Sequence, residues 1–201
     1  VNACLRSGKK IIYISTDFVF DGTKPKGESY TEEDTPNPIN WYAQTKYEGE
    51  KIVQESGLPY LIIRLAYPYR KPFPEKNDLV QVMLTRLQNN EQITAVTDHI
   101  MSPTFVDDLG EALDVLISTN ETGIYHTAGS QPISPYNLAI LIAQLFSLDE
   151  SLIHKTTREE FFSGRAPRPF NLALNSAKIE KLGVKMRTVT EGLGELKKQM
   201  T

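Results

Sequence analysis

The sequence predicts an α/β fold built around a parallel sheet, and two observations lead to that prediction. Short strand-like runs occur three times along the chain, and helical patterns of about 10–15 residues lie between and after them. The first two runs are almost continuously apolar and rich in isoleucine, which is typical of parallel strands covered on both faces. The three runs are residues 10–15, 61–65 and 124–127.

The first half of the chain is divided by clear breakers and caps. Residues 1–7 resemble the end of a helix, with Gly8 as its C-terminal cap, and the first strand follows. Residues 21–40 hold three prolines, two glycines and several acidic residues, and they are predicted to form a long loop. Asn40 provides an N-cap for a helix over residues 41–56, which Gly57 ends.

The second half continues the same alternation. After the second strand, residues 68–78 contain three prolines and are expected to lack regular structure. Apolar residues then recur at helical spacing in four segments. These predicted helices are residues 79–87, 106–117, 135–146 and 190–199.

Composition and charge exclude several classes of protein. The 201 residues are 40% hydrophobic and 23% charged, which is ordinary for a folded domain. The net charge is −3 and no basic run occurs, so neither nucleic acid nor an anionic membrane is an expected partner. The single cysteine excludes an internal disulfide, and the three histidines lack metal-ligand spacing. With no signal peptide and no stretch that spans a bilayer, we expect a cytoplasmic protein without a metal.

A tyrosine followed four residues later by a lysine occurs three times, and in a helix this spacing places both side chains on one face. The pairs are Tyr42/Lys46, Tyr47/Lys51 and Tyr67/Lys71. Pro68 interrupts the third pair. The second pair is explained by a packing tyrosine beside a solvated lysine. The first pair opens a helix that emerges from a proline-rich loop, and we expect it to carry chemistry.

An ammonium group beside a phenol favours the phenolate and so lowers the pKa of the tyrosine from its ordinary value near ~10. Tyr42 could then donate a proton to a developing alkoxide. Ser15 and Thr16 end the first predicted strand, and ligand sites in open α/β sheets lie beyond that edge. Either hydroxyl could orient the reacting oxygen. The alternative is that residues 15–17 form a turn whose side chains bond only local amides.

Longer segments carry a family resemblance. Residues 15–22 read STDFVFDG and residues 38–50 read PINWYAQTKYEGE. Further segments are RLAYPY at 64–69, SPTFVDDL at 102–109, GIYH at 123–126 and RPFNLAL at 168–174. In this order they resemble the signatures of the extended short-chain dehydrogenase/reductases, above all the dTDP-4-dehydrorhamnose reductase family. The methionine adenosyltransferase regulatory β subunit, of the same group, shares several of these segments.

The resemblance implies reduction of a 4-keto sugar nucleotide by NADPH, with NADH as the alternative cofactor, in the synthesis of dTDP-L-rhamnose or another polysaccharide precursor. Tyr42 would donate the proton, and Thr16 would hydrogen-bond the reacting oxygen. Lys46 would hold the nicotinamide ribose and lower the pKa of Tyr42. Ser15, Tyr42 and Lys46 would contact the cofactor, which supplies the hydride.

The resemblance also implies a substrate pocket. Asp17, Phe18 and Tyr67 would line the part that holds the sugar. Arg165 and Arg168 could bind the substrate diphosphate, because a guanidinium group fits phosphate oxygens. The alternative for these two arginines is a solvated place on the surface.

Several positions depart from the family pattern. Tyr67 stands where the family has tryptophan, Phe18 where it has tyrosine and Ala43 where it has glycine. Residues 98–101 read DHIM instead of an acidic-Gln-x-Gly run. The identity of the sugar is therefore open. Two other functions stay open as well, namely a non-catalytic NADP-binding regulatory subunit and a nucleotide-sugar epimerase.

A glycine-rich fingerprint for a dinucleotide pyrophosphate does not occur in the sequence. The resemblance thus implies a Rossmann-like, doubly wound sheet whose N-terminal third is missing, and we expect these residues alone to be inactive. The Rossmann-type portion is expected at residues 1–67 and about 105–129. A smaller substrate lobe is expected at about 68–104 and 130–201. The expected partners are a nucleotide-sugar substrate and a second copy in a homodimer.

Overall fold

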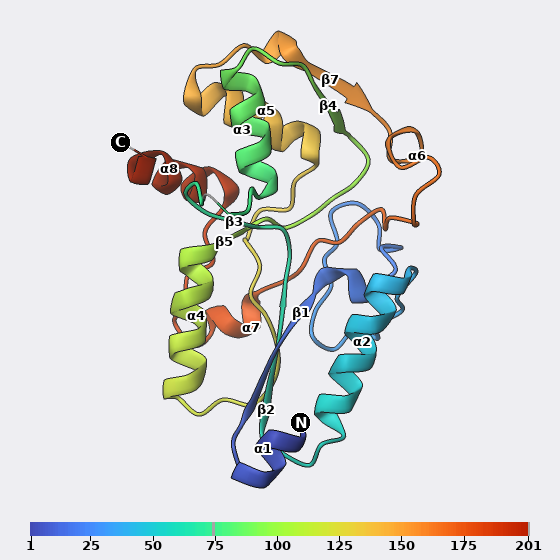
Figure 1. Cartoon of the computed structure of the whole chain (residues 1–201), viewed down its shortest axis with the longest axis vertical. Helices are drawn as coiled ribbons and strands as arrows, with labels where there is room; N and C mark the ends of the chain where they lie inside the picture. The colour runs from blue at the N-terminus through green and yellow to red at the C-terminus, as the bar shows by residue number, and fades with distance from the viewer. Residues whose placement is uncertain (74, 201) are drawn as a thin grey trace.

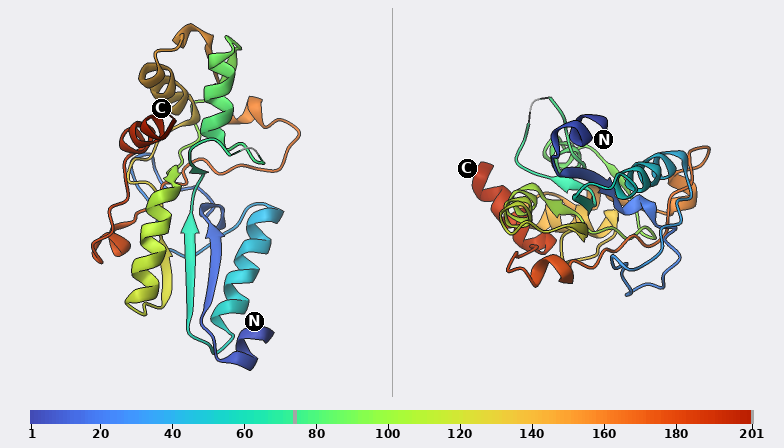
Figure 2. Two further views of the ribbon diagram at one scale, coloured as in Figure 1. Left: turned by 60° about the vertical axis from the view of Figure 1, so that its left-hand side comes forward. Right: turned by 90° about the horizontal axis from the view of Figure 1, so that it is seen from below.

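The computed structural model describes residues 1–73 and 75–200. Its main sheet contains the parallel strands β1 (Ile11–Thr16), β2 (Tyr60–Leu65) and β6 (Gly123–His126), in the order β1-β2-β6. Helix α2 (Trp41–Gln54) lies on one face of this sheet and α4 (Val106–Ser118) on the other, as Figures 1 and 2 show. The α/β fold with a parallel sheet is confirmed.

Helix boundaries follow the caps. Asn40, Asp78 and Ser134 each accept a hydrogen bond from the backbone N–H three residues ahead, at 2.9, 3.0 and 3.2 Å. The other helices are α1 (Asn2–Ser7), α3 (Leu79–Gln88), α5 (Pro135–Phe146), α6 (Arg158–Phe161), α7 (Ala177–Glu180) and α8 (Val189–Met200), and η1 (Asp17–Val19) and η2 (Glu150–Leu152) are 3-10 turns. The five long helices predicted from the sequence are confirmed to within about two residues at each end.

Two short parallel pairs lie outside the main sheet. Strand β3 (Pro68–Tyr69) pairs with β5 (Thr104–Phe105), and β4 (Ile93–Val96) pairs with β7 (Ile153–Thr156). The prediction that residues 68–78 lack regular structure is therefore wrong at β3. A proline is tolerated there because β3 pairs along one edge only.

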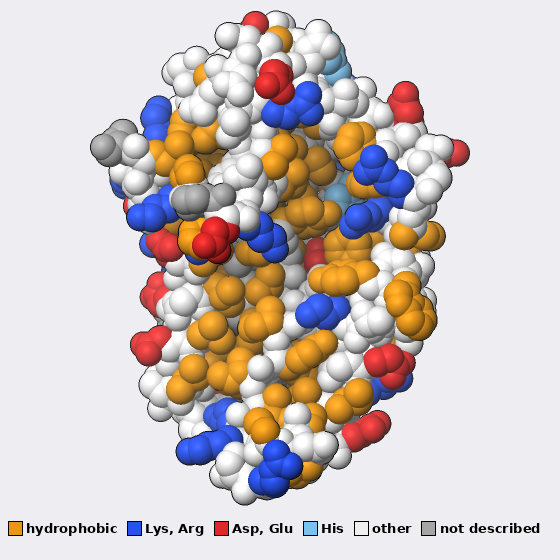
Figure 3. Space-filling view, viewed as in Figure 1, with side chains coloured by type: hydrophobic (Ala, Val, Ile, Leu, Met, Phe, Trp, Pro, Cys, Tyr) orange, Lys and Arg blue, Asp and Glu red, His pale blue; other side chains and the backbone are white. Residues whose placement is uncertain are grey.

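Strand β1 differs from its prediction in burial. The side chains of Ile12 and Ile14 are 40% and 41% exposed, so this strand is not covered on both faces. Ile12 and Ile14 lie opposite Leu61 and Ile63 of β2, which are fully buried under α4. Because α4 covers the sheet only over β2 and β6, the same face of β1 stays open. Figure 3 shows apolar side chains gathered over this lower part of the molecule.

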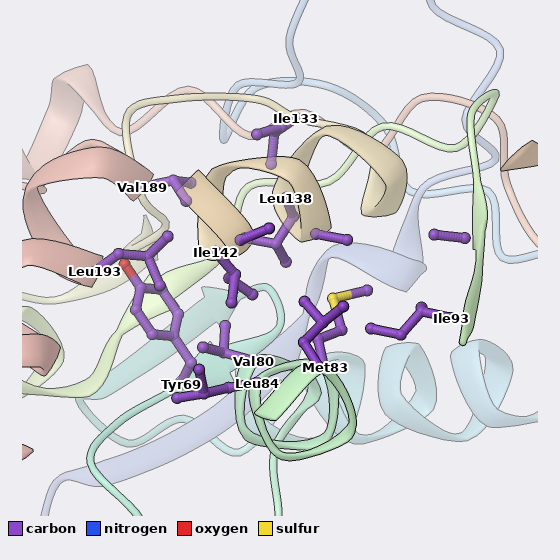
Figure 4. Close-up of a cluster of buried hydrophobic side chains, with 14 of the residues drawn as sticks. Tyr69, Val80, Met83, Leu84, Ile93, Ile133, Leu138, Ile142, Val189 and Leu193 are labelled. Atoms are coloured by element: carbon purple, nitrogen blue, oxygen red, sulfur yellow. The ribbon is translucent and has the colours of Figure 1, made fainter. Parts of the chain in front are cut away.

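The most apolar segment of the sequence forms α5, and α5 is the centre of a buried cluster. Leu138 and Ile142 are fully buried there, facing Tyr69 and Leu193 from other elements (Figure 4). Gly192 of α8 lies so close to the Tyr69 hydroxyl that a Cβ atom at this position would collide with it. Over residues 1–73 and 75–200, no helix combines the length and hydrophobicity needed to cross a membrane.

A buried ion pair fastens α2 to the sheet. The Arg64 guanidinium on β2 donates from Nε and Nη2 to the two carboxylate oxygens of Glu50 on α2, at 2.9 and 2.6 Å. Both side chains are about 1% exposed. This fork-to-fork geometry fixes orientation as well as distance. Gly49 adds a close approach, because any Cβ atom there would overlap the Tyr13 ring of β1.

We predict that Glu50→Gln lowers the free energy of unfolding by about 3–5 kcal/mol, because it leaves the Arg64 charge buried without a counterion. Urea unfolding followed by circular dichroism measures this loss. The control is Lys185→Met, which removes the exposed pair between Lys185 and Glu191 and should change the stability very little. Equal losses in the two variants would show that the buried pair does not hold α2.

Candidate functional site

The site begins where α2 begins. Because Asn40 caps the helix, Tyr42 and Lys46 fall in its first two turns and share one face. The Lys46 ammonium donates a hydrogen bond of 3.0 Å to the backbone carbonyl of Ile14, near the carboxyl end of β1. A side chain from α2 and the end of β1 are thus joined directly.

The end of β1 forms a turn with local hydrogen bonds, as the alternative for residues 15–17 predicts. The Thr16 hydroxyl accepts from the backbone N–H of Phe18 at 3.3 Å and donates to Oδ1 of Asp17 at 2.9 Å. The Ser15 hydroxyl and Oδ2 of Asp17 behave differently. Both atoms are buried, and neither meets a hydrogen-bond partner in the described part of the chain. A turn alone does not account for them.

A cavity of about 280 Å³ lies at this edge of the sheet. Of the residues that the sequence predicts for the site, the following line this cavity: Ser15, Thr16, Asp17, Phe18, Tyr42, Lys46, Tyr67 and Arg168. Every predicted site residue except Arg165 therefore reaches one hollow, from β1, η1, α2, the segment after β2 and the segment after α6. Figure 3 shows this side of the molecule with basic side chains above the apolar lower part.

Asp17 is the acidic residue that lines the cavity. Its side chain is 1% exposed, and burial raises the pKa of its carboxyl group to about 7. The Thr16 hydroxyl and the nearby charge of Arg168 act in the opposite direction but are weaker. A carboxyl group with this pKa can exchange a proton near neutrality, which is typical of functional sites.

The two arginines expected to meet a diphosphate separate in the structure. Arg168 lies over the Phe18 ring, 5.1 Å from its centroid, and lines the cavity. Arg165 instead lines a neighbouring hollow of about 330 Å³, together with Arg158 and Arg168. Arg158 was not predicted from the sequence as a site residue. Its guanidinium group donates a hydrogen bond of 2.9 Å to the backbone carbonyl of Arg168. No sequence motif marks Arg158, because its contact with Arg168 depends on how the segment after α6 folds back.

A second, more apolar hollow of about 310 Å³ adjoins the cavity and shares Tyr67 and Arg168 with it. His99 also lines this hollow, and no motif in the sequence marks this histidine as a site residue. Nε2 of His99 lies within hydrogen-bond distance of the Tyr67 hydroxyl, although the two residues are far apart in the chain. Among the residues that the structure describes, no cluster of three His, Cys, Asp or Glu side chains could hold a metal ion.

The other tyrosine–lysine pairs lie elsewhere. Lys51 forms an ion pair of 2.8 Å with Glu48 and lies over the Tyr47 ring, and neither Tyr47 nor Lys51 lines the cavity. This arrangement fits the explanation given for the second pair, namely a packing tyrosine beside a lysine. Tyr67 has a left-handed backbone with φ of 41° and lies outside any helix, so helical spacing does not apply to its pair with Lys71.

Relatives are found among curated proteins. The chain is 35% identical over 188 residues to methionine adenosyltransferase 2 subunit beta of Rattus norvegicus, covering 90% of this chain and 54% of that protein. It is 32% identical over 191 residues to the spore coat polysaccharide biosynthesis protein SpsK of Bacillus subtilis (strain 168), covering 94% and 64%. This chain thus spans little more than half of the first relative and under two thirds of the second.

A solved structure and a family model also match this chain. The dTDP-4-dehydrorhamnose reductase of Bacillus anthracis strain Ames, determined in complex with NADP, superposes with a TM-score of 0.89 at 33% identity. The match covers 98% of this chain and 68% of that one. The family model of the RmlD substrate binding domain matches residues 1–201. The resemblance expected from the sequence is confirmed, and this chain belongs to the RmlD substrate binding domain family.

Proposed function

We propose that the protein containing this chain reduces a 4-keto sugar nucleotide with NADPH. The observation that carries this proposal is the single cavity that joins Tyr42, Lys46, Thr16 and Asp17 at the carboxyl edge of the sheet. In parallel α/β proteins this edge is where ligands bind. The similarity to a reductase solved with NADP supports the reaction class, and NADH is the alternative cofactor.

The residues present fit the nicotinamide end of such a cofactor. The Ser15 hydroxyl is buried and has no hydrogen-bond partner among residues 1–73 and 75–200, and the Lys46 ammonium is held at the cavity by the Ile14 carbonyl. Ser15, Lys46 and Tyr42 would hold the nicotinamide and its ribose. When bound, the cofactor supplies a hydride.

Tyr42 then acts as proton donor to the sugar oxygen. Its side chain is half exposed, and its ring meets Phe18 edge-on at 6.0 Å, which leaves the phenol accessible from the cavity. Lys46 lies one turn along the same face, where its positive charge favours the phenolate that remains after proton transfer. The Thr16 hydroxyl is proposed to donate to the oxygen that becomes an alkoxide, which requires its proton to turn away from Oδ1 of Asp17.

The sugar is proposed to lie against Asp17, Phe18 and Tyr67, with Arg168 facing the diphosphate. The unpartnered Oδ2 of Asp17 supplies an acceptor for a sugar hydroxyl. The rings of Phe18 and Tyr67 lie 6.5 Å apart and form an apolar wall. Arg165 lies outside this cavity, so we assign it to the outer end of the substrate.

A regulatory subunit is the second candidate, favoured by the 35% identity to methionine adenosyltransferase 2 subunit beta. Such a protein would bind NADP without turning over a sugar. The oxidation of NADPH at 340 nm with 4-keto sugar nucleotides, measured on the protein at its natural length, separates the two functions. Cofactor binding without any turnover would contradict the reductase proposal.

Tyr42→Phe is expected to reduce turnover at least ~100-fold while leaving NADPH affinity nearly unchanged, because it removes the proton donor and keeps the ring. Steady-state kinetics and a fluorescence titration of NADPH measure the two effects. Turnover within a few-fold of the unmodified protein would exclude Tyr42 as the proton donor.

Lys46→Met is expected to weaken NADPH binding and to move the optimum of turnover to higher pH, because one ammonium group serves both ribose and phenol. Lys51→Met is the matched control on the same helix, outside the lining of the cavity, and should change neither property. If the two variants behave alike, the choice of the first tyrosine–lysine pair has no support.

Asp17→Asn is expected to change how stability depends on pH. The folded-state pKa of about 7 lies above the ordinary value of 3.8, so the folded protein binds more protons than the unfolded chain between these values. The contribution of Asp17 is complete below about pH 4 and is lost as the pH rises through 7. The urea midpoint of the unmodified protein should fall between pH 4 and pH 8. Asp17→Asn should lose this fall, and the exposed control Asp114→Asn should keep it. A fall of equal size in both variants would contradict a protonated, buried Asp17.

A further inference from the structure

Tyr67 is held in an unusual backbone conformation between the two hollows. Its φ of 41° is left-handed, which a bulky side chain adopts only when the surroundings impose it. Its carbonyl accepts from the backbone N–H of Thr104, and the preceding carbonyl of Ala66 accepts from the same group at 3.0 Å. This places the phenol at the junction, where it lines both the 280 Å³ cavity and the 310 Å³ hollow.

His99 determines which way the Tyr67 proton points. The His99 side chain is buried, and its Nδ1 lies 2.8 Å from the carbonyl oxygen of Pro169. A carbonyl can only accept, so Nδ1 carries the proton and Nε2 is the acceptor. Nε2 lies 3.1 Å from the Tyr67 hydroxyl, which therefore donates to it.

The ring of His99 stays neutral in this position. Burial is the main cause that lowers its pKa, and the charges of Arg168 and Arg158 add to the effect, while Asp98 and the Pro169 carbonyl oppose it. Burial likewise raises the pKa of Tyr67, so the phenol keeps its proton. The direction of the hydrogen bond is thus maintained at neutral pH.

A hydroxyl group has one proton and two acceptor lone pairs. With its proton committed to His99, the Tyr67 oxygen can offer only acceptor capacity to a ligand at the junction. A phosphate oxygen there would meet a second acceptor and be repelled. A hydroxyl group of a sugar ring would donate and be bound.

We propose that His99 is a positioning residue that makes Tyr67 an obligatory hydrogen-bond acceptor, and that this pair selects sugars bearing a hydroxyl group on the ring carbon that faces it. This rests on the proposed binding of a sugar nucleotide in the cavity. It does not require turnover. The pair thereby distinguishes hydroxylated from deoxygenated sugars at one ring position.

The test compares the binding of several ligands to several protein variants, with each dissociation constant measured by isothermal titration calorimetry. The ligands are dTDP-L-rhamnose and its 2-deoxy and 3-deoxy analogues. The unmodified protein is expected to bind one of the two analogues about tenfold more weakly than the parent sugar. Tyr67→Phe and His99→Leu should each reduce that difference to less than about twofold. Tyr136→Phe, which removes a hydroxyl outside both hollows, should leave it unchanged.

A second readout needs no ligand. Nitrogen-15 NMR of the imidazole should show Nδ1 of His99 protonated and Nε2 unprotonated near neutral pH, in the unmodified protein and in Tyr67→Phe. A proton on Nε2, equal binding of all three sugars, or no binding at all would overturn the inference. Selective binding without any oxidation of NADPH would contradict the reductase proposal and leave this inference standing.

Discussion

The docking of α2 on the parallel sheet is the constraint on which the candidate site depends. Arg64 and Glu50 form a bidentate pair that excludes water, so the helix can neither slide nor rotate without separating two buried charges. Gly49 lets the helix approach the Tyr13 ring, and the Tyr13 hydroxyl donates to the Lys46 carbonyl at 3.3 Å. Because the helix has one allowed register on the sheet, its first two turns reach the carboxyl edge with their phenol and ammonium groups in place.

The carboxyl edge itself is kept polar at a cost to stability. Two buried atoms, the Ser15 hydroxyl and Oδ2 of Asp17, have no partner among the described residues, and buried groups of this kind are expensive to leave unpaired. The left-handed backbone of Tyr67 adds strain at the same place. Features that oppose folding and gather in one cavity are typical of a site whose hydrogen bonds are completed by a ligand.

Much of this arrangement could be predicted from the sequence, and the failures have physical causes. Helix α5 was predicted at its observed bounds because apolar residues recur at helical spacing over residues 135–146. The strands β4 and β7 were missed; each has four residues, too few to show a period, and β6 is the one strand of this length that was predicted. The open face of β1 was missed because burial depends on which helices cover the sheet. Tyr42 and Lys46 were found from their spacing, whereas His99 was missed because only the fold brings it to Tyr67.

The most direct measurement of the proposed reaction follows the hydride itself. The protein at its natural length is incubated with a 4-keto sugar nucleotide and with NADPH deuterated at the transferable position of nicotinamide C4. Mass spectrometry then locates the label in the sugar product. Reduction at the edge of the sheet predicts one deuterium at C4 of the sugar, with the proton on oxygen drawn from Tyr42 and exchangeable with water. Recovery of unlabelled 4-keto sugar together with unreacted, bound NADPH would contradict the reductase function. The protein would then be one that binds the cofactor without reducing a sugar.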